Sequence, residues 1–224
     1  KGFAYKTTDG IYYDISKFKD YGKLSGRTEA DRDAGVSRID ESLDKKNKND
    51  FCLWKFSPFW KTELGEGRPG WHIEDTAITE SFFGPQYDIH GGAVDLVFPH
   101  HEAEVAQMEA ASGKIPLVHY WIHCAFLNLN SSKMSKSRGN FITAREAVEK
   151  FGYRLLRFFF ISNHYRTTLD FNEDVLMQAR GALNRLDEFV SKINVNIEDN
   201  AEELKSEVIK NLDNDFDTPK AMAT

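Results

Sequence analysis

The chain has 224 residues, of which 41% are hydrophobic and 29% are charged, and its formal net charge is −6. This length is enough for one large hydrophobic core and a smaller unit. The acidic balance excludes a global basic surface for nucleic acid, so any contact with RNA must come from local patches. No apolar stretch approaches the length of a membrane-spanning helix, and no membrane partner is expected.

The sequence contains two cysteines, Cys52 and Cys124. Each has aromatic and apolar neighbours, so both are expected to be buried free thiols and not a disulfide. Free thiols are typical of a reducing compartment, which favours the cytoplasm.

Residues 1–56 are predicted to form a β-rich unit. Apolar residues alternate from Ile11 through Tyr13 to Ile15, which is the pattern of a half-buried strand. Asp9-Gly10 before it is a turn signal and predicts a hairpin with residues 3–5. Residues 51–56 form a second apolar strand. Residues 57–70, which contain three glycines and two prolines, are predicted to be a loop.

Two short stretches then carry candidate binding residues. Gly70-Trp71-His72-Ile73-Glu74 combines a glycine that permits a tight turn with a flat apolar wall from Trp71. In residues 88–96, a short strand runs into Gly91-Gly92, where a nucleotide can lie against bare backbone. Asp95 follows and could accept hydrogen bonds from ribose hydroxyls.

Residues 98–104 read Phe-Pro-His-His-Glu-Ala-Glu, and Pro99 suits the first turn of a helix. His100 and Glu104 are four residues apart and therefore share one helix face. An imidazole and a carboxylate placed in this way can ligate zinc. The alternative is an ordinary helix start with acidic residues, which the helix dipole favours.

A basic loop, Lys133-Met-Ser-Lys-Ser-Arg-Gly-Asn140, separates two predicted elements. Residues 118–129 before it form an apolar run that indicates a buried strand. Thr143 and Glu146 after it have the spacing of a capping box, so a helix is expected to begin there. In an open α/β sheet, a loop in this place lies where ligands bind, and its lysines and hydroxyls suit a polyphosphate. Residues 57–150 are accordingly expected to form a parallel sheet with flanking helices.

The C-terminal part is predicted to be helical. Residues 158–161 are an apolar cluster expected in the core. From Leu176 onward, apolar residues recur at spacings of three and four up to Ile193, which predicts an amphipathic helix. Residues 202–224 begin a second, acidic helix.

Four of these stretches together resemble cysteinyl-tRNA synthetases, a family of class I aminoacyl-tRNA synthetases. Residues 133–137, Lys-Met-Ser-Lys-Ser, are similar to their second signature loop, and residues 70–74, 88–96 and 98–104 are similar to three further family stretches. The resemblance implies an α/β fold. This is the second half of a Rossmann-like catalytic domain with a β-rich insertion, followed by the start of a helical bundle.

The resemblance also implies how the chain is divided. Residues 1–56 correspond to the end of the connecting insertion, and residues 57–150 to the second half of the nucleotide-binding domain. Residues 151–175 correspond to the region near the tRNA acceptor stem, and residues 176–224 to the start of the helical bundle. Because the chain begins inside this pattern, we expect a fragment without the first half of the catalytic domain and without the anticodon-binding domain.

The activity implied by the resemblance is ATP-dependent activation of cysteine and its ligation to tRNA(Cys), through cysteinyl-adenylate, by a monomer. ATP would act with Mg²⁺, and Zn²⁺ is the second possible cofactor. The matching positions are catalytic Lys133, Ser135, Lys136 and Ser137; ATP-binding Lys136, His90, Gly91, Gly92 and Asp95; substrate-binding Trp71 and His72; and metal-binding Asp75, His100 and Glu104.

The sequence departs from the family in two ways. It contains no His-x-Gly-His signature, so this chain alone is expected to activate little amino acid. Asp75 also stands where the family has a zinc-binding cysteine, which makes zinc binding doubtful; the simple alternative for Asp75 is a helix cap. Two other functions stay open: a cysteine ligase of the mycothiol-synthesis type, and a non-catalytic paralogue that binds nucleotide or RNA.

Overall fold

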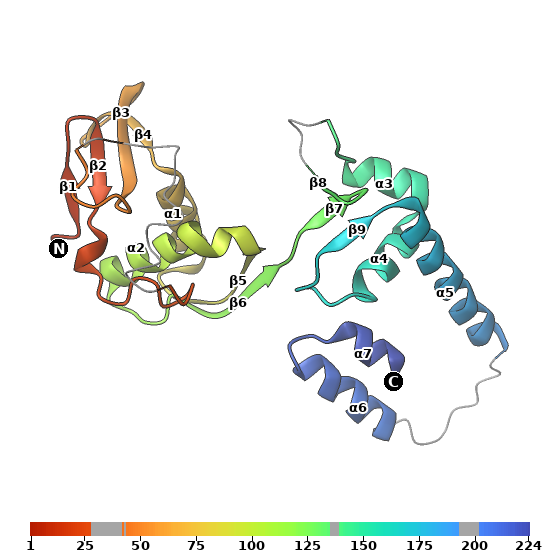
Figure 1. The fold of residues 1–224 in the computed structure, drawn as a ribbon. Coiled ribbons are helices and arrows are strands. Elements are labelled where there is room, and N and C mark those ends of the chain that lie inside the picture. The colour runs from red at the N-terminus through yellow and green to blue at the C-terminus, as the bar shows by residue number, and fades with distance from the viewer. Residues whose placement is uncertain (28–41, 43, 135–138, 193–201) are drawn as a thin grey trace. The chain divides into compact units, whose positions relative to one another are not determined.

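The computed structural model describes residues 1–27, 42, 44–134, 139–192 and 202–224. The chain forms two compact units, Lys1–His123 (unit 1) and Cys124–Thr224 (unit 2), shown in Figure 1. Helices and strands occur in both units, which agrees with the α/β class. The division falls inside the predicted 57–150 segment, and the four predicted segments stay predictions.

Unit 1 begins with a four-stranded antiparallel sheet in the order β1-β2-β3-β4. The predicted hairpin is confirmed, because Ala4 pairs with Tyr13 across the turn that contains Asp9. Ile15 leaves the strand and starts a 3-10 helix, since the Asp14 side chain accepts a hydrogen bond from Ser16 N–H at this point. The strands are β1 (Ala4–Lys6), β2 (Gly10–Tyr13), β3 (Phe51–Thr62) and β4 (Gly65–Pro69), and the 3-10 helix is η1 (Ile15–Lys17).

The prediction of a loop over residues 57–70 is wrong, because β3 and β4 form a long hairpin there. The register shifts between Phe56 and Trp60, so Pro58 lies in an irregular part of the ladder, where a missing N–H is tolerated. Gly65 makes the turn with a φ of +112°. At Gly67 a Cβ would come within 2.4 Å of Trp54 Nε1. Gly65 therefore forms the turn, Pro58 lies in the irregular part of the ladder, and Gly67 permits a close packing contact.

The rest of unit 1 packs helices against this sheet. Tyr13 stacks on Phe51 with ring centroids 4.8 Å apart, and its hydroxyl donates a hydrogen bond to the Ala106 carbonyl. This contact fixes α2 over the sheet, and Met108 of α2 belongs to the same buried core. The elements are α1 (Trp71–Phe83), β5 (Tyr87–Ala93), η3 (Val94–Leu96), η4 (Val97–His101), α2 (Glu102–Ser112) and β6 (Val118–Cys124).

In unit 2, the short strand β7 lies between two others and pairs antiparallel with β8 and parallel with β9. The capping box is confirmed, because the Thr143 side chain accepts a hydrogen bond from Glu146 N–H and Glu146 accepts one from Thr143 N–H. Phe159 and Phe171 lie in the core below these strands. The elements are β7 (Leu127–Leu129), β8 (Ser132–Lys133), α3 (Ala144–Phe151), α4 (Tyr153–Ile161), β9 (Leu169–Phe171), α5 (Glu173–Lys192), α6 (Glu202–Asp213) and α7 (Thr218–Ala223).

The parallel sheet expected over residues 57–150 is not confirmed, because the described strands of this segment are divided among three small sheets. The predicted strand at 118–129 is split into β6 and β7, and most of β6 is exposed or half-buried because its sheet has only two strands.

Two predictions of burial are wrong in part. Cys52 is buried as predicted, but the prediction for Cys124 is wrong, because it is exposed. Of the cluster at 158–161, Phe160 and Ile161 are exposed, since they lie away from the core side of α4.

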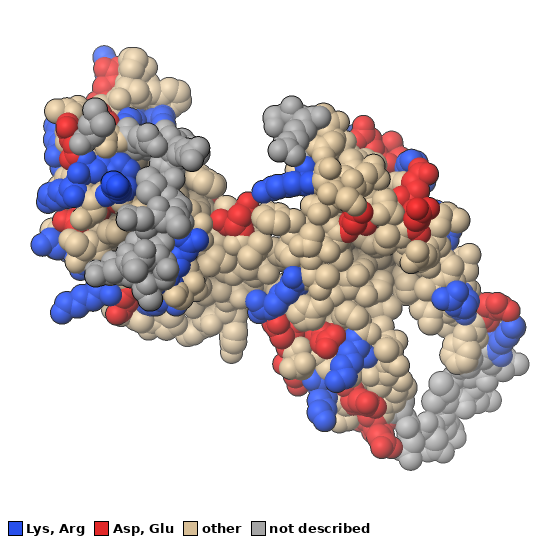
Figure 2. All heavy atoms as spheres, viewed as in Figure 1, with Lys and Arg blue, Asp and Glu red and all other residues tan. Residues whose placement is uncertain are grey.

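The amphipathic helix predicted from Leu176 is confirmed as α5, and Ile193 lies outside the described residues. Among the helices that the structure describes, none is long and apolar enough to cross a membrane. In Figure 2, lysine and arginine side chains gather over the β-rich part of unit 1 on the face drawn, whereas acidic and basic side chains alternate over unit 2. Although the net charge of the chain is negative, basic side chains therefore gather in a local patch on unit 1.

Candidate active site

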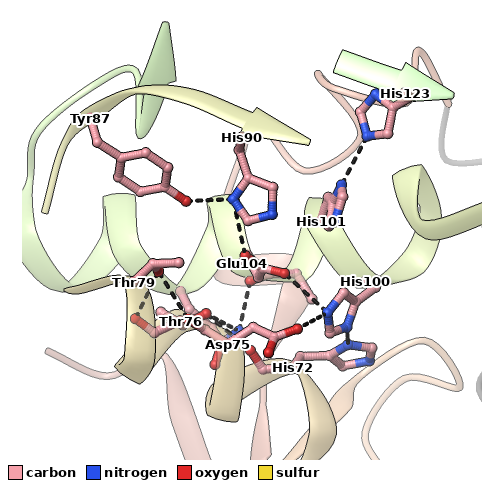
Figure 3. Close-up of polar contacts among 12 residues, drawn as sticks. His72, Asp75, Thr76, Thr79, Tyr87, His90, His100, His101, Glu104 and His123 are labelled. Carbon is pink, nitrogen blue, oxygen red and sulfur yellow. Dashed lines mark hydrogen bonds and ion pairs between the residues drawn. The ribbon is translucent and has the colours of Figure 1, made fainter. Parts of the chain in front are cut away.

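Two helices of unit 1 bring the candidate metal ligands together. Helix α1 begins directly after Gly70, and a Cβ at this glycine would lie 1.9 Å from the Cys52 carbonyl oxygen. Only glycine lets the chain pass so close to β3 before it turns into the helix. Asp75 then lies in the first turns of α1, facing the start of α2 (Figure 3).

His100 and Glu104 lie one turn apart at the junction of η4 and α2, as their spacing predicts. His100 Nε2 is 3.1 Å from Glu104 Oε1. The same nitrogen is 2.6 Å from Asp75 Oδ2 on α1. One imidazole nitrogen therefore faces two carboxylates that come from different helices (Figure 3).

Burial raises the free energy of the charged groups in this arrangement. The His100 and Glu104 residues are 2% and 0% exposed. Burial alone would lower the pKa of His100, but the carboxylates of Glu104 and Asp75 beside its Nε2 outweigh burial and raise the pKa above its usual value. Neither oxygen of Glu104 has a hydrogen-bond partner of good geometry among the described residues. A buried carboxylate in this condition requires a compensating positive charge.

The donor set fits a divalent metal ion. Asp75, His100 and Glu104 each offer one ligand atom, and these atoms lie within 4.8 Å of one another. Nitrogen and carboxylate oxygen are both zinc ligands, and Glu104, which lies beside two histidines but forms no hydrogen bond among the described residues, is the group that such an ion would satisfy. The structure therefore brings together the three residues that sequence analysis named, and their role as ligands stays a prediction.

The two residues predicted for the amino-acid pocket both contact His100. The Trp71 ring stacks on the His100 ring with centroids 4.2 Å apart and is 43% exposed. His72 is buried behind His100, with the two Nδ1 atoms 2.7 Å apart. Burial, followed by the neighbouring His100, lowers the pKa of His72 to about 3. Trp71 is thus the one of the pair that reaches solvent, where a substrate can approach.

The predicted nucleotide-binding stretch lies on β5 and η3. His90 Nδ1 is 2.6 Å from the Tyr87 hydroxyl oxygen and 3.9 Å from Glu104 Oε2. At Gly92 a Cβ would come within 2.6 Å of the His101 ring, so close packing alone already requires glycine there. Gly91 and Asp95 are exposed. The ATP-binding role of His90, Gly91, Gly92 and Asp95 stays a prediction.

Sequence reasoning gave no role to His101 and His123, which complete a continuous histidine cluster. His101 Nδ1 is 2.8 Å from His123 Nε2 (Figure 3). His90, His101 and Glu104 also form a second group whose ligand atoms lie within 4.8 Å of one another. The only signal in the sequence was the repetition of histidine at 100–101 and its recurrence in β6 at 123, two residues after Trp121.

The signature loop belongs to unit 2. Lys133 ends β8, and its ammonium group lies 4.2 Å from the centroid of the Phe126 ring. Its carbonyl accepts a hydrogen bond from Asn140 Nδ2, which closes the base of the loop. Lys133 therefore lies on the returning strand of the β7–β8 hairpin, and not in a loop that follows the strand at 118–129 as predicted. Ser135, Lys136 and Ser137 lie outside the described residues.

Comparison with known proteins supports the resemblance. Residues 1–181 match the family described as tRNA synthetases class I (C) catalytic domain. The chain belongs to this family. It is 47% identical to the cysteine–tRNA ligase of Thermoplasma acidophilum over 97% of this chain and 50% of that protein. It is 44% identical to the cysteine–tRNA ligase of Carboxydothermus hydrogenoformans, over 100% of this chain and 51% of that protein.

As a member of the class I synthetase family, the chain spans about half the length of the curated relatives it matches. The cysteine–tRNA ligase of Geobacter metallireducens shows the same relation, with 44% identity over 99% of this chain and 49% of that protein. The match to the family covers the whole histidine cluster and the signature loop, and it ends within α5.

Proposed function

We propose that the protein takes part in ATP-dependent activation of cysteine and its ligation to tRNA(Cys). The observation that carries this proposal is the convergence of the buried His100 and Glu104 with the half-exposed Asp75 beside an exposed Trp71, in a chain of the class I synthetase family. This set offers a place for a metal that recognises a thiol. The relatives cited above are all cysteine–tRNA ligases, which supports the same substrate.

In the proposed reaction, the cysteine carboxylate attacks the α-phosphate of ATP, which gives cysteinyl-adenylate and releases pyrophosphate. A hydroxyl at the 3′ end of tRNA(Cys) then takes the cysteinyl group from the adenylate, and AMP leaves. Lys133 and Lys136, with the hydroxyls of Ser135 and Ser137, neutralise the pyrophosphate oxygens while Mg²⁺ accompanies ATP. Such a site works by positioning and charge stabilisation, with little covalent chemistry from the protein.

The other residues of this chain bind and orient. His90, Gly91, Gly92 and Asp95 are proposed to hold the adenosine, and Trp71 to form a wall of the cysteine pocket. Asp75, His100 and Glu104 would hold Zn²⁺, with two carboxylates to balance its charge. When bound, zinc supplies selectivity, because a soft thiolate binds it in preference to the hydroxyl of serine. A monomeric chain in the cytoplasm stays a prediction.

A non-catalytic paralogue is the second candidate, and one observation favours it. The chain has Asp75 in place of the family's thiolate and lacks a His-x-Gly-His tetrapeptide. On either proposal, this chain alone supports little cysteine activation. A cysteine ligase of the mycothiol-synthesis type would use the same adenylation site but transfer cysteine to an amino sugar, so the identity of the acceptor distinguishes it from the tRNA ligase.

A chimera tests the proposal. The matching half of the Thermoplasma acidophilum ligase is replaced by this chain, and cysteine-dependent ATP–pyrophosphate exchange is measured, followed by cysteine transfer to tRNA(Cys). Lys136→Ala should slow exchange by about 2–4 kcal/mol of barrier, the size of one preorganised charge donor. The Michaelis constant for ATP should change less, because the charge matters most as pyrophosphate leaves.

Three results would contradict this assignment. A folded chimera without cysteine-dependent exchange supports the non-catalytic paralogue. Exchange without transfer to tRNA(Cys) supports a different acceptor. If Lys136→Ala keeps its turnover and only raises the Michaelis constant for ATP, the role given to Lys136 is wrong.

A further inference from the structure

Two imidazole rings share a single hydrogen bond behind the candidate metal site. His72 Nδ1 and His100 Nδ1 are 2.7 Å apart, and both residues are buried. At this distance one nitrogen must carry the proton and the other must accept it, because two N–H groups or two lone pairs would repel each other. The contact therefore couples the tautomers of the two rings.

The surroundings of His100 decide the direction of this bond when a metal is bound. His100 Nε2 faces Asp75 and Glu104, so this is the nitrogen that an ion between the carboxylates would bind. The proton of His100 must then lie on Nδ1, and it is donated to Nδ1 of His72. Without an acceptor there, the two carboxylates favour the tautomer that carries its proton on Nε2, where the proton competes with the metal.

We propose that His72 is a positioning residue for the metal site: its Nδ1 accepts the Nδ1–H of His100 and so holds His100 Nε2 free and aimed between Asp75 and Glu104. This inference rests on the metal site of the proposed function. Partners of this kind orient the first ligand and raise its basicity. It gives His72 a role behind the ligand, in place of the substrate contact predicted from the sequence.

The structure fixes His72 for this task. Its backbone carbonyl accepts hydrogen bonds from Gln107 Nε2 at 3.2 Å and from Thr76 Oγ1 at 3.0 Å. Its ring meets the Phe51 ring edge-on, with centroids 5.5 Å apart. Gln107 also bonds Thr76 Oγ1, so α1 and α2 are tied together beside His72. The backbone of His72 is therefore held between two helices, and its buried ring packs against Phe51, Trp71 and His100.

A matched pair of substitutions tests the proposal on the 224-residue chain. In His72→Asn, the amide oxygen can occupy the place of Nδ1 and still accept the proton, whereas His72→Leu has nearly the same shape without an acceptor. Zinc affinity is measured by competition with a chromophoric chelator, and the visible spectrum of the Co²⁺-loaded protein reports the ligand geometry. The thermal unfolding midpoint in chelator compares the folds of the metal-free proteins.

His72→Leu should bind zinc about 10- to 100-fold more weakly than wild type, the usual loss when such a partner is removed. His72→Asn should recover most of the affinity and the wild-type Co²⁺ spectrum. If His72→Leu does not fold, His72→Gln takes its place, because its amide reaches toward the Nε2 position and should fail in the same way.

Two outcomes overturn the inference: an acceptor-free variant that binds zinc as tightly as wild type, or a folded His72→Asn as weak as His72→Leu. A wild-type chain without zinc also overturns it. Cysteine-dependent exchange in the chimera is read independently, so loss of this inference does not by itself remove the proposed function.

Discussion

Two carboxylate clusters, one in each unit, use similar partners in different surroundings. In unit 1, Glu104 and Asp75 meet His100; the side chains of Glu104 and His100 are 1% and 2% exposed, whereas that of Asp75 is 46% exposed. In unit 2, Asp215 accepts hydrogen bonds from the Tyr165 hydroxyl and from the Arg166 guanidinium, and its side chain is 44% exposed. In both clusters, carboxylates lie within ion-pair distance of basic side chains.

The difference in exposure changes what each cluster can do. In unit 2, water screens the charges, and an always-charged guanidinium already neutralises the carboxylate, so the cluster contributes only modestly to stability. In unit 1, burial removes that screening for Glu104 and His100, and Glu104 is left without a good hydrogen-bond partner among the described residues. Only the buried cluster therefore has a reason to take up a cation.

The largest expected effect is the loss of metal binding in Glu104→Gln. The amide keeps the shape of the side chain but removes the charged ligand, so zinc affinity should fall by at least about a hundredfold, more than the loss of a supporting residue. Chelator competition measures it. The matched control is Glu102→Gln, which changes a fully buried acid on the same helix that binds the Gly22 and Ser25 N–H groups instead.

Glu102→Gln should lower the free energy of unfolding by about 1–3 kcal/mol, since it weakens two buried charge-assisted hydrogen bonds, and leave zinc affinity intact. If both variants lose zinc equally, the effect of Glu104→Gln comes from the fold and the contrast between the clusters fails.

A smaller effect is expected when the ligand set is made softer. Asp75→Cys restores a thiolate at a half-exposed position of the buried cluster, so zinc should bind more tightly by a factor on the order of ten. Atomic absorption on both proteins gives the zinc content per chain, and chelator competition gives the affinity. A wild type that already holds one tight zinc, and that Asp75→Cys does not improve, would contradict our account of this exchange.

The smallest effect is expected in unit 2. The Arg166 hydrogen bonds, followed by the Tyr165 hydroxyl, lower the pKa of Asp215 from 3.8 to about 2. The stabilisation is therefore fully present above about pH 4 and is lost as the pH falls toward 2. After solvent screening, Asp215→Asn should cost no more than about 1 kcal/mol of unfolding free energy at neutral pH.

Urea unfolding between pH 7 and pH 2 measures this cost, with Asp213→Asn on α6 as the control outside the cluster. The difference between Asp215→Asn and wild type should shrink toward zero at the acid end. A cost of several kcal/mol would show that the Asp215 cluster behaves like a buried one, and the comparison between the units would have to be withdrawn.

The sequence by itself determined the local features of this protein. The hairpin at Asp9, the capping box at Thr143 and the shared face of His100 and Glu104 all follow from rules that act within a few residues. The family resemblance was also contained in short contiguous stretches. These features could be predicted because backbone periodicity and capping do not depend on distant neighbours.

The tertiary structure alone decided the features that join distant residues. It paired the glycine-rich residues 57–70 into a hairpin, in which Gly67 lies so close to Trp54 that no side chain fits there. It placed His72 behind His100 and left Glu104 buried without a good hydrogen-bond partner among the described residues. Burial and contacts between helices arise only when elements pack, since the free energy of a charge depends on what surrounds it in space and not on its neighbours along the chain.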